Sequence, residues 1–216
     1  AEGPSWARQD WPQAANGELV SALDGNWGEI VVKAQGALTK RAVAEGTPAP
    51  TPVDVLQATR DSIHAIMMIR AYRMRGHLHA NLDPLGIAKP LEDYNELSPE
   101  NYGFTSADYD RPIFLDNVLG LEFGTIRQML DILTRTYCST LGVEFMHIQH
   151  SDEKAWIQQR IEGIRNQTQF TARGRRAILQ RLIEAEEFER FLHVKFTGTK
   201  RFGLDGGETT IPAIEQ

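Results

Sequence analysis

The spacing of hydrophobic residues predicts a mainly helical protein. Over residues 55–75, a face at steps of three and four holds Leu56, Thr59, Ile63, Ile66, Met67 and Arg70. This is the period of one side of an α-helix. Asp54 stands where an N-cap residue would, and Gly76 stands where a helix-ending C′ glycine would. We therefore expect the clearest helix of the chain between these two positions.

Three further segments show helical spacing. Residues 124–137 carry apolar side chains at helical intervals, and Ser151 is placed to cap a helix that ends near Gly163. Thr171 is placed to cap a longer helix, and its expected buried face holds Ile178, Leu179, Leu182, Ile183, Phe188, Phe191 and Leu192. Residues 140–148 are apolar and fit either a strand or a buried extended link. Residues 211–216 look like the first turns of another helix.

The first 54 residues are interpreted as a leader or linker. They carry three tryptophans, Trp6, Trp11 and Trp27, and a proline-rich run over residues 46–52 that cannot propagate a helix. The segment is either a loosely ordered leader or a connector whose tryptophans dock on another surface. Residues 77–122 read as irregular, with short helices starting at Ser98 and Ser106.

Charge and composition exclude several classes of protein. The chain has 216 residues and a net charge of −6, whereas nucleic-acid-binding proteins usually carry a basic stripe. Its apolar runs are too short for a membrane helix, which needs about 18 residues, and its first residues do not resemble a secretory signal. A single cysteine, Cys138, cannot form an internal disulfide, which fits a reducing compartment. The first residue is not Met, which suggests a piece of a longer chain.

Candidate metal ligands lie directly after the first predicted helix. His77, His79 and Asp83 could share a metal ion, but a fourth ligand is not obvious in the sequence. The alternative, which we favour, is that His77 and Asp83 hydrogen-bond the backbone where the chain turns. We expect no metal site in this chain.

Two further groups of residues could bind an anion. Arg70, Arg73 and Arg75 could hold a phosphate, although they do not share one helix face, and the acidic stretch over residues 83–122 offers internal partners. The run from Gly203 to Glu208 could cradle an anion with its amides. However, its acids would repel an anion, and a tight turn entering a helix fits better.

The residues alone do not compose a complete active site. Cys138 has no feature that marks it as a nucleophile, and a free cysteine is usually a small buried apolar residue. We find neither a nucleophile elbow nor a zinc-protease motif. No catalytic residue is therefore assigned within this chain.

Five segments in consistent order resemble 2-oxoglutarate dehydrogenase, the thiamine-diphosphate-dependent first component of its complex. They read IRAYRMRGHLHANLDPLG over 69–86, ELSPENYGF over 96–104, YCSTLGVEFMHI over 137–148, EKAWIQQR over 153–160 and KRFGLDGGE over 200–208. The likeness covers essentially the whole chain and is weakest over residues 28–54. It implies that this sequence is an N-terminal portion of a chain several times longer.

The resemblance implies a fold and a place in that enzyme. Residues 55–195 would be a helical domain, and residues 196–216 would be the incomplete start of an α/β thiamine-diphosphate-binding domain. The cofactor and Mg²⁺ would be bound by residues beyond this segment, whose role would be structural support. Phe202 matches an aromatic residue near the 2-oxo acid pocket and would shield a reacting carbanion from water; a core position beneath the glycine turn is the alternative. Some animal members bind Ca²⁺ after the first motif, but Lys89 and Pro90 interrupt that stretch here, so we expect no calcium site.

The implied partners and the competing functions complete these expectations. The implied partners are the rest of its own chain, a second subunit of a homodimer and the dihydrolipoyl succinyltransferase core, without nucleic acid or membrane. The implied location is the bacterial cytoplasm or the mitochondrial matrix. By itself the 216-residue chain is expected to be inactive. One alternative is the relative that uses 2-oxoadipate, and another is a non-catalytic helical module for protein interaction.

Overall fold

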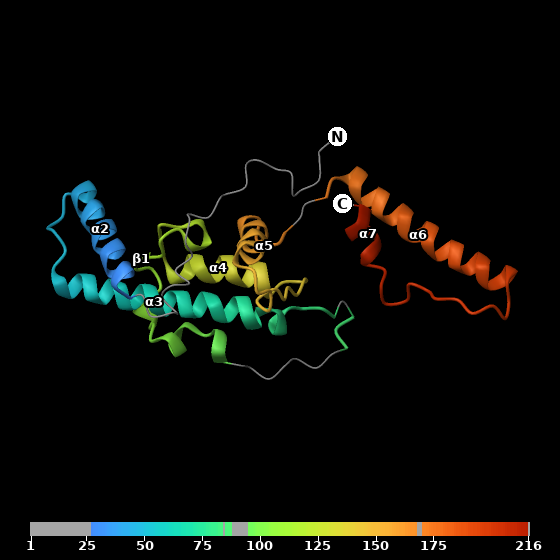
Figure 1. The fold of residues 1–216 in the computed structure, drawn as a ribbon, viewed down its shortest axis with the longest axis horizontal. Helices are drawn as coiled ribbons and strands as arrows, with labels where there is room; N and C mark the ends of the chain where they lie inside the picture. The colour runs from blue at the N-terminus through green and yellow to red at the C-terminus, as the bar shows by residue number, and fades with distance from the viewer. Residues whose placement is uncertain (1–26, 84, 88–94, 168–169, 216) are drawn as a thin grey trace. The chain divides into compact units, whose positions relative to one another are not determined.

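The computed structural model describes residues 27–83, 85–87, 95–167 and 170–215 (Figure 1). The chain divides into two units, one formed by the described residues up to 167 and the other by residues 170–215. Both units are built mainly of helices, and the strands of the described residues form a single two-stranded sheet. The expected mainly α fold is therefore confirmed. Within the described residues, we find no helix with the length and apolarity needed to span a bilayer.

Helix α3, Pro52–Arg75, is the long helix that the periodicity predicted. It begins slightly earlier than expected, because Thr51 is the N-cap and Asp54 is its capping-box partner. The Thr51 hydroxyl accepts from the Asp54 amide at 3.3 Å, and the Asp54 carboxylate accepts from the Thr51 amide at 2.8 Å. Pro52 fits the first turn because its missing N–H would have no intrahelical partner there.

The end of α3 and its buried face both differ from expectation. Gly76 has right-handed angles, φ −57° and ψ −33°, and the chain continues directly into the 3₁₀-helix η2, Gly76–His79. A Cβ at Gly76 would lie 2.5 Å from the Cβ of Tyr137, so this position needs glycine for a close approach rather than for a left-handed turn.

Leu56 and Met67, which we expected on the buried face, are exposed. The helix carries two apolar stripes, and spacing alone did not show which one faces the core.

Helix α2, Trp27–Glu45, lies within the segment interpreted as a leader or linker. It packs against α3 and buries Ile30 and Ala34 completely. Lys33 forms an ion pair with Asp116, with 2.8 Å between Nζ and Oδ2. The linker interpretation overlooked this helix because much of its buried face is alanine, which gives a weak hydrophobic signal. Trp6, Trp11 and the side chain of Trp27 lie outside the described residues.

The core of this unit lies between α3 and helix α4, Ile126–Tyr137. Helix α5, Ser151–Gly163, follows, with His150 rather than Ser151 at its N-cap. Residues 140–148 form no strand; they are a link in which Phe145 is buried, at 2% exposed, whereas Leu141, Glu144 and His147 are exposed. The buried residues of this core are Ala65, Met68, Ile69, Tyr72, Leu97, Phe104, Ile113, Leu115, Ile126, Met129, Leu133, Tyr137 and Phe145.

The irregular segment between α3 and α4 is built of short elements, as expected. Its 3₁₀-helices are η3 (Asn95–Leu97), η4 (Pro99–Tyr102), η5 (Ser106–Asp108) and η6 (Val118–Gly120). The predicted starts at Ser98 and Ser106 coincide with η4 and η5. Strands β1 (Ile113–Phe114) and β2 (Phe123–Gly124) pair antiparallel, with Ile113 opposite Gly124. This small hairpin packs its Ile113 and Leu115 into the core.

The second unit consists of helix α6, Ala172–Lys195, a segment that folds back along it, and helix α7, Thr210–Glu215 (Figure 1). Thr171 caps α6 as predicted, because its hydroxyl accepts from the Gly174 amide at 3.1 Å. The expected buried face of α6 is wrong for this chain. None of the α6 residues, all of which the structure describes, is buried.

Candidate functional site

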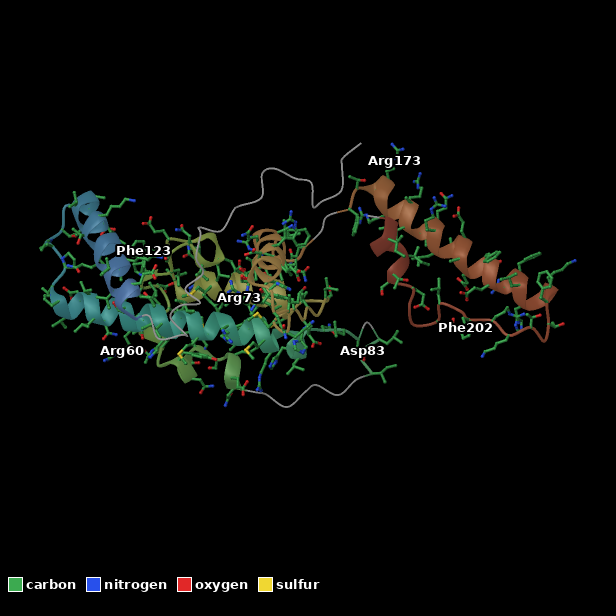
Figure 2. All side chains as sticks on the ribbon, viewed as in Figure 1. Arg60, Arg73, Asp83, Phe123, Arg173 and Phe202 are labelled. Atoms are coloured by element: carbon green, nitrogen blue, oxygen red, sulfur yellow. The ribbon has the colours of Figure 1, made fainter. Side chains whose placement is uncertain are left out.

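A network of nearly buried charged side chains joins α3, α4 and α5. Arg73 from α3 binds Glu162 from α5 through two contacts, Nε to Oε1 at 2.8 Å and Nη2 to Oε2 at 3.1 Å. The Tyr137 hydroxyl from α4 donates to Glu162 Oε1 at 2.6 Å. The side chains of Arg73 and Glu162 are only 11% and 8% exposed. Figure 2 labels Arg73 on the side of α3 that carries this contact.

This network holds three helices together and is not a reactive centre. Burial, followed by the negative charge of Glu162, raises the pKa of Tyr137 well above its usual value. The phenol therefore stays protonated and keeps donating to the carboxylate. Both guanidinium contacts to Glu162 are short and paired, which is the geometry of a strong bidentate ion pair.

Arg70, Arg73 and Arg75 of α3 do not converge on a phosphate site. Arg73 is bound to Glu162, whereas Arg75 pairs with Glu96 of η3, with 2.9 Å between Nη1 and Oε2. Arg70 is exposed. Arg75 therefore pairs with a residue of the acidic stretch over residues 83–122, as expected, whereas Arg73 pairs with a residue of α5.

The structure does not bring His77, His79 and Asp83 together as a metal centre. Within the described ranges, no three histidine, cysteine, aspartate or glutamate side chains gather in a geometry that could hold a metal ion. Asp83 accepts from the Leu85 amide at 2.9 Å, in the loop after η2 that Figure 2 labels, so its expected role in a turn is confirmed. His77 instead points its Nε2 toward Glu144, 3.5 Å from Oε1.

A second buried acid was missed by the sequence analysis. Asp61, 5% exposed on the inner side of α3, accepts from Arg111 Nη1 at 2.5 Å and from Gln57 Nε2 at 2.9 Å. Arg111 also contacts Asp108 at 2.9 Å. The hydrogen bond that Arg111 donates to Asp61 is the largest cause of the raised pKa of Arg111. The sequence signal that could have predicted this pair is an aspartate within an apolar stripe of a helix, because a buried carboxylate requires a partner.

Cys138 has the character of an apolar residue. Its thiol is half-buried, and burial raises its pKa to about 11. A thiol protonated at neutral pH is a poor nucleophile. The structure thus agrees with the interpretation of Cys138 as a packing residue.

The glycine-rich turn after α6 uses its amides internally. Leu204 donates to Glu189 Oε1 at 2.8 Å, and Gly206 donates to Glu208 Oε1 at 3.0 Å. The Gly207 amide donates to the Leu204 carbonyl at 2.6 Å. Carboxylates therefore stand where a bound anion would need free N–H groups. The turn interpretation is supported, and α7 follows directly after it.

Phe202 lies on the surface of the second unit, as Figure 2 shows. Its side chain is 87% exposed, so it is not a core residue beneath the glycine turn. The Lys200 ammonium lies 5.3 Å from its ring centroid. Most of this ring is therefore available for contact with a further part of the protein or with a ligand.

Comparison with known proteins shows which proteins this chain is similar to. The chain matches the 2-oxoglutarate dehydrogenase E1 components of Brucella canis, Brucella suis and Brucella melitensis with 64% identity over 222 aligned positions. Over its whole length, this chain is similar to 2-oxoglutarate dehydrogenase E1 components. The match covers 100% of the chain and 22% of each of these relatives, so the chain spans about a fifth of their length. A scan against protein-family models found no match.

The 64% identity over the whole chain confirms the resemblance that the five motifs indicated. In the structure, the first and third of these motifs meet in the core of the first unit. Arg73 comes from the first motif and Tyr137 from the third, and both bind Glu162. The motifs thus supply the residues that fix how α3, α4 and α5 pack.

Proposed function

We propose that this chain is the structural, non-catalytic portion of an enzyme that oxidatively decarboxylates 2-oxoglutarate and transfers the succinyl group to a lipoyl group. The observation that carries the proposal is the 64% identity over the whole chain to proteins named 2-oxoglutarate dehydrogenase E1 component. The core of the first unit, closed by the ion pair of Arg73 and Glu162, supplies a rigid support. It would hold the catalytic part of the protein in position.

The described residues do not fit thiamine diphosphate and Mg²⁺. Within them, no group of three metal-ligating side chains exists, and the amides of the glycine-rich turn are occupied by Glu189 and Glu208. We propose that the cofactor is held by the rest of a full-length chain. When bound, thiamine diphosphate would supply the electron sink for decarboxylation.

Phe202 is our candidate for contact with the 2-oxo acid. Its exposed ring can cover a neighbouring pocket and keep water from a reacting carbanion. The partners would be a second subunit and the dihydrolipoyl succinyltransferase core. Because the matched relatives are bacterial, we propose the cytoplasm as its location.

The test of this function uses the protein encoded by the complete gene. With thiamine diphosphate and Mg²⁺, it should decarboxylate 2-oxoglutarate, while the 216-residue chain should not. Rates on 2-oxoadipate, which is one methylene longer, separate the two substrates. A full-length product without activity on either acid would leave the interaction module as the function.

Phe202 is tested by a pair of variants in that full-length protein. Phe202→Leu should raise KM for 2-oxoglutarate, whereas Phe196→Leu, at a half-exposed aromatic of the same unit, should not. Equal kinetics in the wild type and Phe202→Leu would remove Phe202 from the substrate site.

A further inference from the structure

The unit that contains α6 has no hydrophobic core of its own. Among the side chains described between residues 170 and 215, none is buried, whereas the first unit holds a core of thirteen buried residues. The large apolar side chains that α6 exposes are Leu179 at 57%, Ile183 at 50%, Phe188 at 60%, Phe191 at 56% and Val194 at 73%. A segment of this size without a core cannot be stable alone.

The folded-back segment after α6 covers only one side of this helix. Arg201 donates to the Leu192 carbonyl at 3.2 Å, and Leu204 donates to Glu189 at 2.8 Å. On this side, the folded-back segment partly covers three large apolar residues, Ile178, Leu182 and Leu192. These contacts account for one stripe of the helix and leave its flanks open.

The exposed apolar residues lie on both flanks of that covered stripe. Successive residues turn by about 100° around a helix. This places Leu179, Ile183 and Val194 on one flank, and Phe188 and Phe191 toward the other. Large apolar side chains therefore lie on more than one side of α6, with charged residues between them.

A helix on the surface of a domain needs only one apolar stripe, so apolar side chains on further sides indicate further packing contacts. A second copy of this chain, pairing helix to helix, would cover one stripe of about 100° and leave the other flank in water. Polypeptide that wraps both flanks satisfies the pattern. Relatives of this chain contain additional polypeptide, since the chain accounts for only 22% of their length.

We propose that residues 170–215 are part of the neighbouring domain, and that the rest of a full-length chain packs over both exposed flanks of α6. This rests on the proposed function, since it takes the full-length protein to be of the length of its relatives. It places the domain boundary at residues 167/168, ahead of α6, instead of at residues 195/196. Helix α6 then belongs with the segment that carries Phe202, and not with the core of α3 and α4.

The test measures thiol reactivity at single positions in two forms of the protein. Val194→Cys and Phe188→Cys place a thiol on each flank of α6. Val32→Cys, on α2, is the matched control, because Val32 is 69% exposed and Val194 is 73% exposed. Each variant is labelled with a maleimide, in the 216-residue chain and in the full-length protein, and the site is read by peptide mass spectrometry.

In the 216-residue chain, all three thiols should react at similar rates. In the full-length protein, Val194→Cys and Phe188→Cys should react at least tenfold more slowly, relative to Val32→Cys. Unchanged relative rates would overturn the proposal. Protection that appears in the short chain and grows with its concentration would also overturn it, because a second copy would then be the occupant.

A second measurement covers the case in which a variant fails to fold. Hydrogen exchange of the unmodified proteins should show α6 peptides protected in the full-length form and fast in the short form; equal exchange would count against the proposal. Decarboxylase activity is measured separately. An inactive full-length protein with protected α6 would reject the proposed function while keeping this domain boundary.

Discussion

The ion pair of Arg73 and Glu162 offers the sharpest test of what holds the first unit together. Glu162→Gln keeps the size of the side chain and an oxygen that can accept from Tyr137, but it removes the charge. Arg73, whose side chain is 11% exposed, then loses the carboxylate of Glu162. Removing one partner of a buried pair costs about 3–5 kcal/mol, because the remaining charge stays desolvated. With a urea m-value of about 2 kcal/mol/M, the unfolding midpoint should fall by about 2 M.

The measurement is urea unfolding of the 216-residue chain followed by circular dichroism. A double-mutant cycle with Arg73→Met isolates the pair, and the double variant should be clearly more stable than the sum of the two single losses predicts. Asp110→Asn is the control, since its partner Arg127 is 67% exposed and Asp110 is 77% exposed. That control should leave the midpoint unchanged, because exposed pairs are screened by water. If Glu162→Gln behaves like the control, or if the cycle shows no coupling, the argument from burial is wrong.

Three further predictions test local features of the same unit. Gly76→Ala should lower stability by about 1–3 kcal/mol by pushing against Tyr137, whereas Gly36→Ala, with open space around it, should not destabilise; equal melting temperatures for the two would contradict this. Cys138 has a pKa of about 11 instead of 9.0, so the folded state keeps its proton up to higher pH. At pH 8 its alkylation should be about 100-fold slower than that of a free thiol, and a rate near the free-thiol value would refute the inert assignment. Thr125→Ala removes the hydroxyl that caps α4 and should cost about 1 kcal/mol in thermal unfolding, while Thr125→Ser should retain most of the stability.

The sequence located the helices well where large apolar residues repeat. Helix α3 was predicted from its spacing, and Thr171 was correctly recognised as the cap of α6. These features are local, because a cap and a helical face involve residues three or four positions apart. Helix α2 was not predicted, because alanines such as Ala34 form much of its buried side and give a weak hydrophobic pattern.

The candidate site was less predictable than the helices. Asp83 could be placed in a turn from its own neighbours, but the partner of Arg73 could not be found in this way. Glu162 lies 89 positions further along the chain, and Asp61 pairs with Arg111 across 50 positions. The residues next to each partner in the sequence do not indicate which distant residue it pairs with.

The sequence by itself therefore determined the resemblance to 2-oxoglutarate dehydrogenase, the helical character and most helix boundaries. Only the tertiary structure showed which stripe of α3 faces the core and that Gly76 is needed for the close contact with Tyr137. It also showed that none of the side chains of α6 is buried. The physical reason is that periodicity reports which side of a helix is apolar. What that side meets depends on packing between segments far apart in the chain, and on polypeptide that a single segment does not contain.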